Sequence, residues 1–143
     1  MCGIAGFFTA EDKKIMNLDD FFKDITLMSQ LRGKDSTGML FLDENYDLSY
    51  EKKAIQAADF LDLAKIQEKV REVDNYYGAL VHCRARTTGL TNQETAHPFI
   101  ETDTSGAINF GMVHNGTLKT WDKKEYLSDS QYLAKKLYVD GYQ

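Results

Sequence analysis

The sequence contains a single proline, only two cysteines and no excess of positive charge. Two cysteines cannot form a disulfide framework, so we expect free thiols in a reducing, cytoplasmic setting. A net charge of −5 with no basic cluster argues against a nucleic-acid binder, because such proteins neutralise phosphates with Lys and Arg. No apolar run approaches the roughly 18 residues that cross a membrane. We therefore expect a globular protein that binds neither nucleic acid nor membrane.

The 143 residues suffice for one domain, 1–143, with a substantial core. Apolar residues at helical spacing predict helices over 18–31, 57–72 and 129–138, the first capped by Asn17 and the last by Ser128 or Asp129. Short apolar runs predict strands over 2–8, 39–42, 48–50, 78–84 and 108–114, with a loop over 32–38. This mixture of helices and strands predicts layers of α and β structure that share one core.

The first eight residues, MCGIAGFF, contain a potential nucleophile. Removal of Met1 would make Cys2 the amino terminus, and cysteine is small enough to permit that removal. A thiol and an α-amine would then share one residue, so the nucleophile would carry its own base. Taken alone, the segment is more typical of the start of a buried strand.

Four polar segments interrupt the packing pattern, at 32–38, 82–89, 96–99 and 114–116, and each follows a predicted strand or helix, where binding loops often lie. The Asn-Gly pair in the last segment is by itself most typical of a hairpin turn. The spacing of His82, His97 and His114 fits no zinc pattern, so we expect structural histidines and no metal. The sequence has no P-loop and no dinucleotide fingerprint, and we expect no cofactor.

In this order and at these spacings, the segments resemble the class II glutamine amidotransferases, whose nucleophile is an N-terminal cysteine. MCGIAGFF resembles the family's first strand, LRGKDSTG its Arg-Gly-x-Asp-Ser loop and HCRARTTG its His-x-Arg segment, while AHPF, HNG and LSDSQ are similar to three further blocks. The resemblance runs from residue 1 to about 138. It implies an α+β fold of the N-terminal-nucleophile (Ntn) hydrolase type, a four-layer αββα sandwich with two sheets between helices.

The resemblance also implies a role for each matching residue. Cys2 would attack the side-chain amide of L-glutamine and form a γ-glutamyl thioester, with its α-amine as the base. Asn115 and the backbone N–H of Gly116 would stabilise the oxyanion. At the amino-acid end of the substrate, Arg84 and Thr87 would bind the carboxylate and Asp129 the ammonium.

Three further residues, Arg32, Asp35 and Ser36, are expected to form a hydrogen-bonded turn that supports the nucleophile strand. Two departures from the family pattern stand out. Ala85 replaces an aromatic residue that often follows the motif arginine on a closing loop, and Arg86 comes next. The family's domains also continue with further strands, so we expect the fold to be truncated at its C-terminus.

A separate synthase subunit, or a second copy of the chain, would then cover the exposed sheet region and receive the ammonia. Two alternatives remain open from the sequence. The first is an Ntn amidase that acts on another γ-glutamyl or amide substrate. The second is a non-catalytic domain that binds glutamine for a regulatory purpose.

Overall fold

The computed structural model describes residues 1–10, 16–86 and 92–141 of the chain. The elements within these ranges are, in order, β1 (Gly3–Phe8), α1 (Leu18–Gln30), β2 (Ser36–Leu42), β3 (Leu48–Lys53), α2 (Ala57–Leu61), α3 (Ala64–Arg71), the 3₁₀ helix η1 (Val73–Asn75), β4 (Gly78–Arg84), β5 (Phe99–Thr102), β6 (Ile108–Met112) and α4 (Asp129–Val139). None of the described helices is long and apolar enough to span a membrane.

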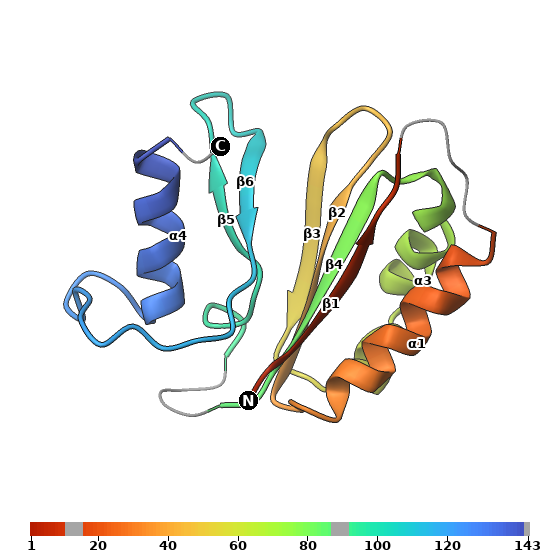
Figure 1. Cartoon of the computed structure of the whole chain (residues 1–143), viewed down its shortest axis with the longest axis horizontal. Helices are drawn as coiled ribbons and strands as arrows, with labels where there is room; N and C mark the ends of the chain where they lie inside the picture. Colours follow the sequence, from red (N-terminus) through yellow and green to blue (C-terminus); the bar gives the residue numbers. More distant parts are fainter. Residues whose placement is uncertain (11–15, 87–91, 142–143) are drawn as a thin grey trace.

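Two antiparallel sheets lie between helices. The larger sheet has the strand order β1-β4-β2-β3, and the smaller one pairs β5 with β6. Helices α1 and α3 cover one face of the larger sheet, the smaller sheet lies across the other face, and α4 packs on the far side of the smaller sheet (Figure 1). The fold is therefore α+β, and the order of its layers is compatible with the αββα sandwich.

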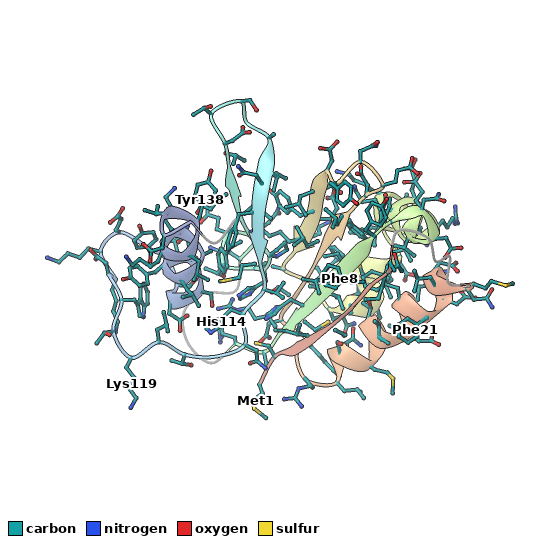
Figure 2. The ribbon with its side chains drawn as sticks, turned by 45° about the horizontal axis from the view of Figure 1, so that its top comes forward. Met1, Phe8, Phe21, His114, Lys119 and Tyr138 are labelled. Atoms are coloured by element: carbon teal, nitrogen blue, oxygen red, sulfur yellow. The ribbon has the colours of Figure 1, made fainter. Side chains whose placement is uncertain are left out.

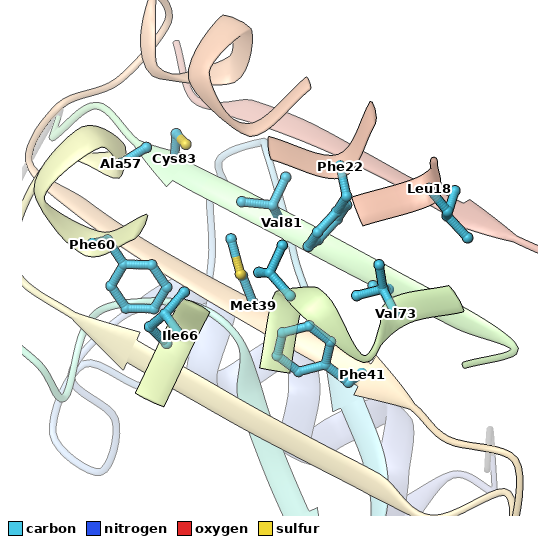
Figure 3. Close-up of a cluster of buried hydrophobic side chains, with 12 residues drawn as sticks. Leu18, Phe22, Met39, Phe41, Ala57, Phe60, Ile66, Val73, Val81 and Cys83 are labelled. Carbon is cyan, nitrogen blue, oxygen red and sulfur yellow. The ribbon is translucent and has the colours of Figure 1, made fainter. Parts of the chain in front are cut away.

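The apolar core fills the space between the larger sheet and its helices. Phe22 of α1 lies edge-on to Phe7 of β1 and to Phe41 of β2, with ring centroids 5.6 and 6.2 Å apart. Figure 3 shows Phe22, Val81 and other side chains of this cluster between helix and sheet. Because side chains alternate along a strand, β1, β2 and β4 contribute every second residue to this core, among them Phe7, Phe41 and Val81, whereas the core cluster of the described residues includes no residue of β3.

The helix expected over 57–72 is wrong as a single element, because Leu63 is extended, with ψ 129°, and separates α2 from α3. In one continuous helix Ile66 would lie about 120° around the axis from Phe60, given 3.6 residues per turn. The break allows both side chains to enter the core, where each is almost completely buried. Burial of two separate apolar faces thus overrides the helical pattern.

Two other local predictions are corrected by the structure, and one strand is additional. The loop expected over 32–38 ends earlier, because Ser36, Thr37 and Gly38 pair with β4 as part of β2. Asn17 precedes α1 in the left-handed region (φ 59°) and its side chain makes no capping hydrogen bond, whereas Ser128 caps α4 by accepting from the backbone N–H of Gln131 at 3.1 Å. Strand β5 had not been predicted.

Candidate active site

A cavity of about 410 Å³ brings together residues from both ends of the sequence. Cys2 reaches it from the start of β1, Arg84 from the end of β4, Gly116 from the segment after β6, and Asp129 from the first turn of α4. Met1 and His114 lie at the same end of the two sheets, as Figure 2 shows. Four of the residues predicted to act on substrate therefore line one site.

Cys2 is held through its backbone carbonyl. The Nε of Arg32 and the Nδ2 of Asn115 each donate a hydrogen bond to the Cys2 carbonyl oxygen at 3.1 Å. The half-buried thiol donates to the carbonyl oxygen of Ala85 at 3.7 Å, and the cysteine is free. The side chain of Cys2 is therefore directed toward the end of β4, where Arg84 enters the cavity.

The His114-Asn115-Gly116 segment is fixed against both β4 and α4. The carbonyl oxygen of His114 is 3.2 Å from Nε2 of His82, and Nδ1 of His114 is 2.9 Å from the hydroxyl of Ser130. A Cβ at Gly116 would lie 2.6 Å from Nε2 of His114, so a larger residue would displace the histidine ring. The amide of Asn115 has a second N–H beyond the one that it donates to Cys2.

Arg84 and Asp129 are both anchored by hydrogen bonds. Nη1 of Arg84 donates to the hydroxyl of Thr95 at 3.0 Å. The two carboxylate oxygens of Asp129 accept from the backbone N–H groups of Leu118, at 2.8 Å, and Ser130, at 2.9 Å. A carboxylate oxygen can accept more than one hydrogen bond, and a negative charge is favourable at the start of a helix. Asp129 thus retains the capacity to accept from a ligand.

The turn from Arg32 to Ser36 packs against the end of β4. Besides the bond from Arg32 to Cys2, the backbone N–H of Asp35 donates to the carbonyl oxygen of Arg84 at 2.9 Å, and the Asp35 carboxylate accepts from the backbone N–H of Arg86. Ser36 is buried and lies opposite Arg84 in the register of β2 and β4. Of the predicted site residues, Thr87 lies outside the described residues.

Two buried histidines stack on each other beneath the cavity. The rings of His82 and His97 have centroids 3.9 Å apart. Burial lowers the pKa of His82 to about 4 and that of His97 to about 2, so both rings are neutral at neutral pH. Within the described ranges, neither ring nitrogen of His97 has a hydrogen-bond partner, and no group of three or more His, Cys, Asp and Glu side chains is arranged to hold a metal ion.

The cavity wall also contains residues that sequence reasoning did not select for the site, namely Thr95, His97, His114, Trp121, Lys123 and Ser130. The two histidines were expected only to be structural. Trp121 is the single tryptophan and lies in a polar segment, which was a usable signal. Nothing in the sequence distinguishes Thr95, because its position depends on contacts with Arg84 and Asn92 that only folding produces.

Two curated proteins match most of the chain. The glutamine–fructose-6-phosphate aminotransferase (isomerizing) of Thermotoga maritima is 29% identical over 130 residues, which make up 89% of this chain and 19% of that protein. The protein of the same name from Mycolicibacterium smegmatis is 28% identical over 128 residues, or 85% of this chain and 18% of that protein. The resemblance to class II glutamine amidotransferases is confirmed.

The chain spans about a fifth of the length of the two curated relatives. No family model matches it. The aligned share of the chain is large enough to include most of the segments that carry the resemblance. The roles of the individual residues around the cavity remain predictions.

Proposed function

We propose that this chain hydrolyses the side-chain amide of L-glutamine to glutamate and ammonia, with Cys2 as the nucleophile after removal of Met1. The observation that carries the proposal is the single cavity shared by Cys2, Arg84, Gly116 and Asp129. The names of both relatives include glutamine as a substrate, which supports the same ligand. Residues 1–143 would then be a glutaminase domain.

The first chemical step is attack of the Cys2 thiolate on the amide carbon of glutamine, after the α-amine has accepted the thiol proton. A carbon–sulfur bond forms, and the amide oxygen becomes an oxyanion. When the carbon–nitrogen bond breaks, the α-ammonium returns its proton to the leaving group, and ammonia departs. Water then attacks the γ-glutamyl thioester, the same amine accepts a proton from that water, and glutamate and the free thiol are regenerated.

The segment after β6 would stabilise the oxyanion. The second N–H of Asn115 and the backbone N–H of Gly116 are donors next to Cys2, and Asn115 already bonds the carbonyl of that residue. Donors that are held in place before the reaction stabilise the developing charge without reorganising. The contacts of His114 with β4 and α4 supply that rigidity.

The two charged ends of the amino acid would meet complementary charges. The guanidinium of Arg84 would bind the α-carboxylate, with Thr87 as a further donor, and Asp129 would bind the α-ammonium. Arg32, Asp35 and Ser36 would act through the backbone, since their contacts are with Cys2 and with the end of β4. Specificity for a free amino acid follows from these paired charges.

A partner would receive the ammonia. Ile4 is 41% exposed and Phe8 is 68% exposed, both on the face of β1 that points away from the helices. We propose that a separate synthase subunit, or a second copy of this chain, covers this apolar strip. Sedimentation velocity of the wild-type chain and of the Phe8→Ser variant would distinguish the two. If the chain self-associates, the variant should associate more weakly. If the wild-type chain is a monomer, the strip would be covered by another protein.

The deciding experiment measures the intact mass before and after incubation with a diazo-ketone analogue of glutamine, together with ammonia release from glutamine. We expect loss of the Met1 mass, one adduct on Cys2 that excess glutamine prevents, and no adduct or ammonia with Cys2→Ala. Hydrolysis that persists in Cys2→Ala would exclude Cys2 as the nucleophile. A chain with residues before Cys2 that cannot be removed should be inactive.

One observation favours a non-catalytic glutamine-binding domain as the second candidate. The side-chain amide of Asn115, one of the two donors proposed for the oxyanion, already donates to the carbonyl oxygen of Cys2, and Asn115 is not among the described residues that line the cavity. Such a domain would bind glutamine, measured by calorimetry, without releasing ammonia. An amidase with another substrate would instead hydrolyse N-acylated glutamine as well as glutamine, because the Asp129 contact would then be unnecessary.

A further inference from the structure

Lys52 of β3 connects the larger sheet to the segment from Thr95 to Pro98. Its Nζ donates to the carbonyl oxygens of Ala96, at 2.9 Å, and Pro98, at 3.0 Å. The same Nζ lies 5.2 Å from the ring centroid of Phe99. Burial lowers the pKa of Lys52 below its ordinary value, and the nearby charge of Glu94 opposes this. Lys52 is thus a partly buried hydrogen-bond donor that bridges β3 and the segment from Thr95 to Pro98, rather than a solvated surface charge.

The bridged segment is tightly confined on its other sides. The ring of His97 stacks on His82, and the carbonyl oxygen of His97 occupies the space that a side chain at Gly38 would need. Before it, the side chain of Asn92 accepts from the backbone N–H of Thr95 at 2.9 Å. Because the carbonyls of Ala96 and Pro98 flank His97, the two bonds from Lys52 determine how deeply this segment sits against β2 and β4.

The segment from Thr95 to Pro98 begins at Thr95, the residue whose side chain contacts Arg84. Ala96 directly follows Thr95, whose hydroxyl accepts from Nη1 of Arg84 at 3.0 Å. Both Thr95 and Arg84 line the cavity, whereas Lys52 does not. A shift of the segment would therefore move the hydroxyl and alter the direction of the guanidinium inside the cavity.

We propose that Lys52 is a positioning residue for glutamine binding, because it fixes the segment that orients Arg84 toward the substrate carboxylate. This inference rests on the proposed glutaminase function. Lysine suits the task since an ammonium has three donors and can bond two carbonyl oxygens at once. A misplacement of about 1 Å at a group that binds substrate can reduce activity by about 100-fold.

The test compares Lys52→Met with Lys53→Met. Lys53 is the next residue of β3, is exposed and points to the opposite face, so its replacement removes the same charge without the bridge. We expect Lys52→Met to raise KM for glutamine by about 10- to 100-fold, while kcat and the rate of iodoacetamide alkylation at Cys2 stay within about twofold. Lys52→Arg, which can still donate to both carbonyls, should restore much of the affinity.

A second readout does not depend on glutamine turnover. Amide hydrogen exchange at Thr95 and His97 should be about tenfold faster in Lys52→Met than in Lys53→Met, as expected for the loss of two hydrogen bonds. If wild type released no ammonia, the glutaminase proposal would fail, and this exchange would still decide whether the bridge holds the segment. Equal exchange in the two variants, or a fall in kcat with unchanged KM in Lys52→Met, would overturn the inference.

Discussion

The two faces of the larger sheet differ in polarity. Toward the helices, β4 presents Val81 and Cys83 to a cluster of aromatic and aliphatic side chains. Toward the smaller sheet, the same strand presents His82 and Arg84 to a polar layer that includes buried atoms without partners among the described residues. Burial on the first face raises the pKa of the Cys83 thiol to about 11, so this cysteine is an inert core residue.

Within β4, the residues on one face therefore contribute mainly to stability, and those on the other face contribute mainly to the proposed chemistry. The helix face buries most of the large apolar side chains, which provide the main favourable contribution to folding. The other face contains polar groups whose burial costs free energy unless they are hydrogen-bonded. We infer that changes on the helix face will mainly affect the free energy of unfolding, and changes on the polar face will mainly affect glutamine turnover.

The largest effect is expected from Phe22→Ala on the helix face. Phe22 is fully buried and contacts the rings of Phe7 and Phe41, so its loss should lower the free energy of unfolding by about 3–5 kcal/mol. Phe21 precedes it in α1 and is 50% exposed, so Phe21→Ala should cost less than about 1 kcal/mol. Urea unfolding measures both. Equal losses in the two variants would mean that the buried ring of Phe22 adds no more to stability than an exposed ring does.

Next in size is Asn115→Ala on the polar face. The loss of an oxyanion donor should lower kcat for glutamine hydrolysis by about 100- to 1,000-fold with little change in KM. Lys119→Ala is the matched control, because Lys119 is exposed on the same segment after β6. Steady-state kinetics over a range of glutamine concentrations, which give kcat and KM separately, make the comparison. A rise in KM with unchanged kcat would assign Asn115 to ground-state binding instead.

A smaller effect is expected from Arg84→Lys. A lysine keeps the charge but cannot form the two-pronged contact with a carboxylate, so KM for glutamine should rise by about 10- to 100-fold. Arg86→Lys tests the neighbouring, exposed arginine and should leave KM within about twofold. If both variants bound glutamine as wild type does, the carboxylate would have another partner.

The smallest expected effect, counted per pH unit and per histidine, is a dependence of the free energy of unfolding on pH. The pKa of His82 is lowered to about 4 and that of His97 to about 2, against about 6.5 in an unfolded chain. Between pH 6.5 and 4 the unfolded chain binds more protons, so stability falls as the pH falls, by up to about 1.4 kcal/mol per pH unit for each histidine. Above pH 6.5 this contribution is complete and constant.

The variant His97→Gln isolates one of these contributions. Urea unfolding between pH 6.5 and 4.5 should show a slope shallower than that of wild type by up to about 1.4 kcal/mol per pH unit. Carboxylates also titrate in this range, but they affect both proteins alike. Parallel slopes would mean that His97 is protonated in the folded state as readily as in the unfolded one.

Much of the larger sheet could be predicted from the sequence, because its strands have local signals. β4 was predicted with its observed bounds, from an apolar run that starts at a glycine and ends at an arginine. The smaller sheet could not be predicted fully. β5 has four residues, of which only Phe99 is buried, so its pairing with β6 depends on the neighbouring layers rather than on its own pattern.

Prediction of the site from the sequence has the same limit. Cys2, Arg84, Gly116 and Asp129 were selected from motifs, and the structure places all four around one cavity. Thr95 and Lys52 had no motif, since their importance comes from hydrogen bonds between segments far apart in the sequence. Sequence reasoning identifies residues whose type suits a chemical task. It does not identify residues that matter because of where folding places them.

The hydrogen bonds that Cys2 accepts from Arg32 and Asn115 both end on its carbonyl oxygen, which lies on the far side of the residue from Met1. Cleavage of the bond between Met1 and Cys2 would break neither of them. Met1 itself is 79% exposed and so within reach of a processing aminopeptidase. If Met1 is removed as proposed, excision after folding would leave these two bonds to the carbonyl oxygen of Cys2 in place and would remove the 3.8 Å contact between Nη2 of Arg32 and the sulfur of Met1.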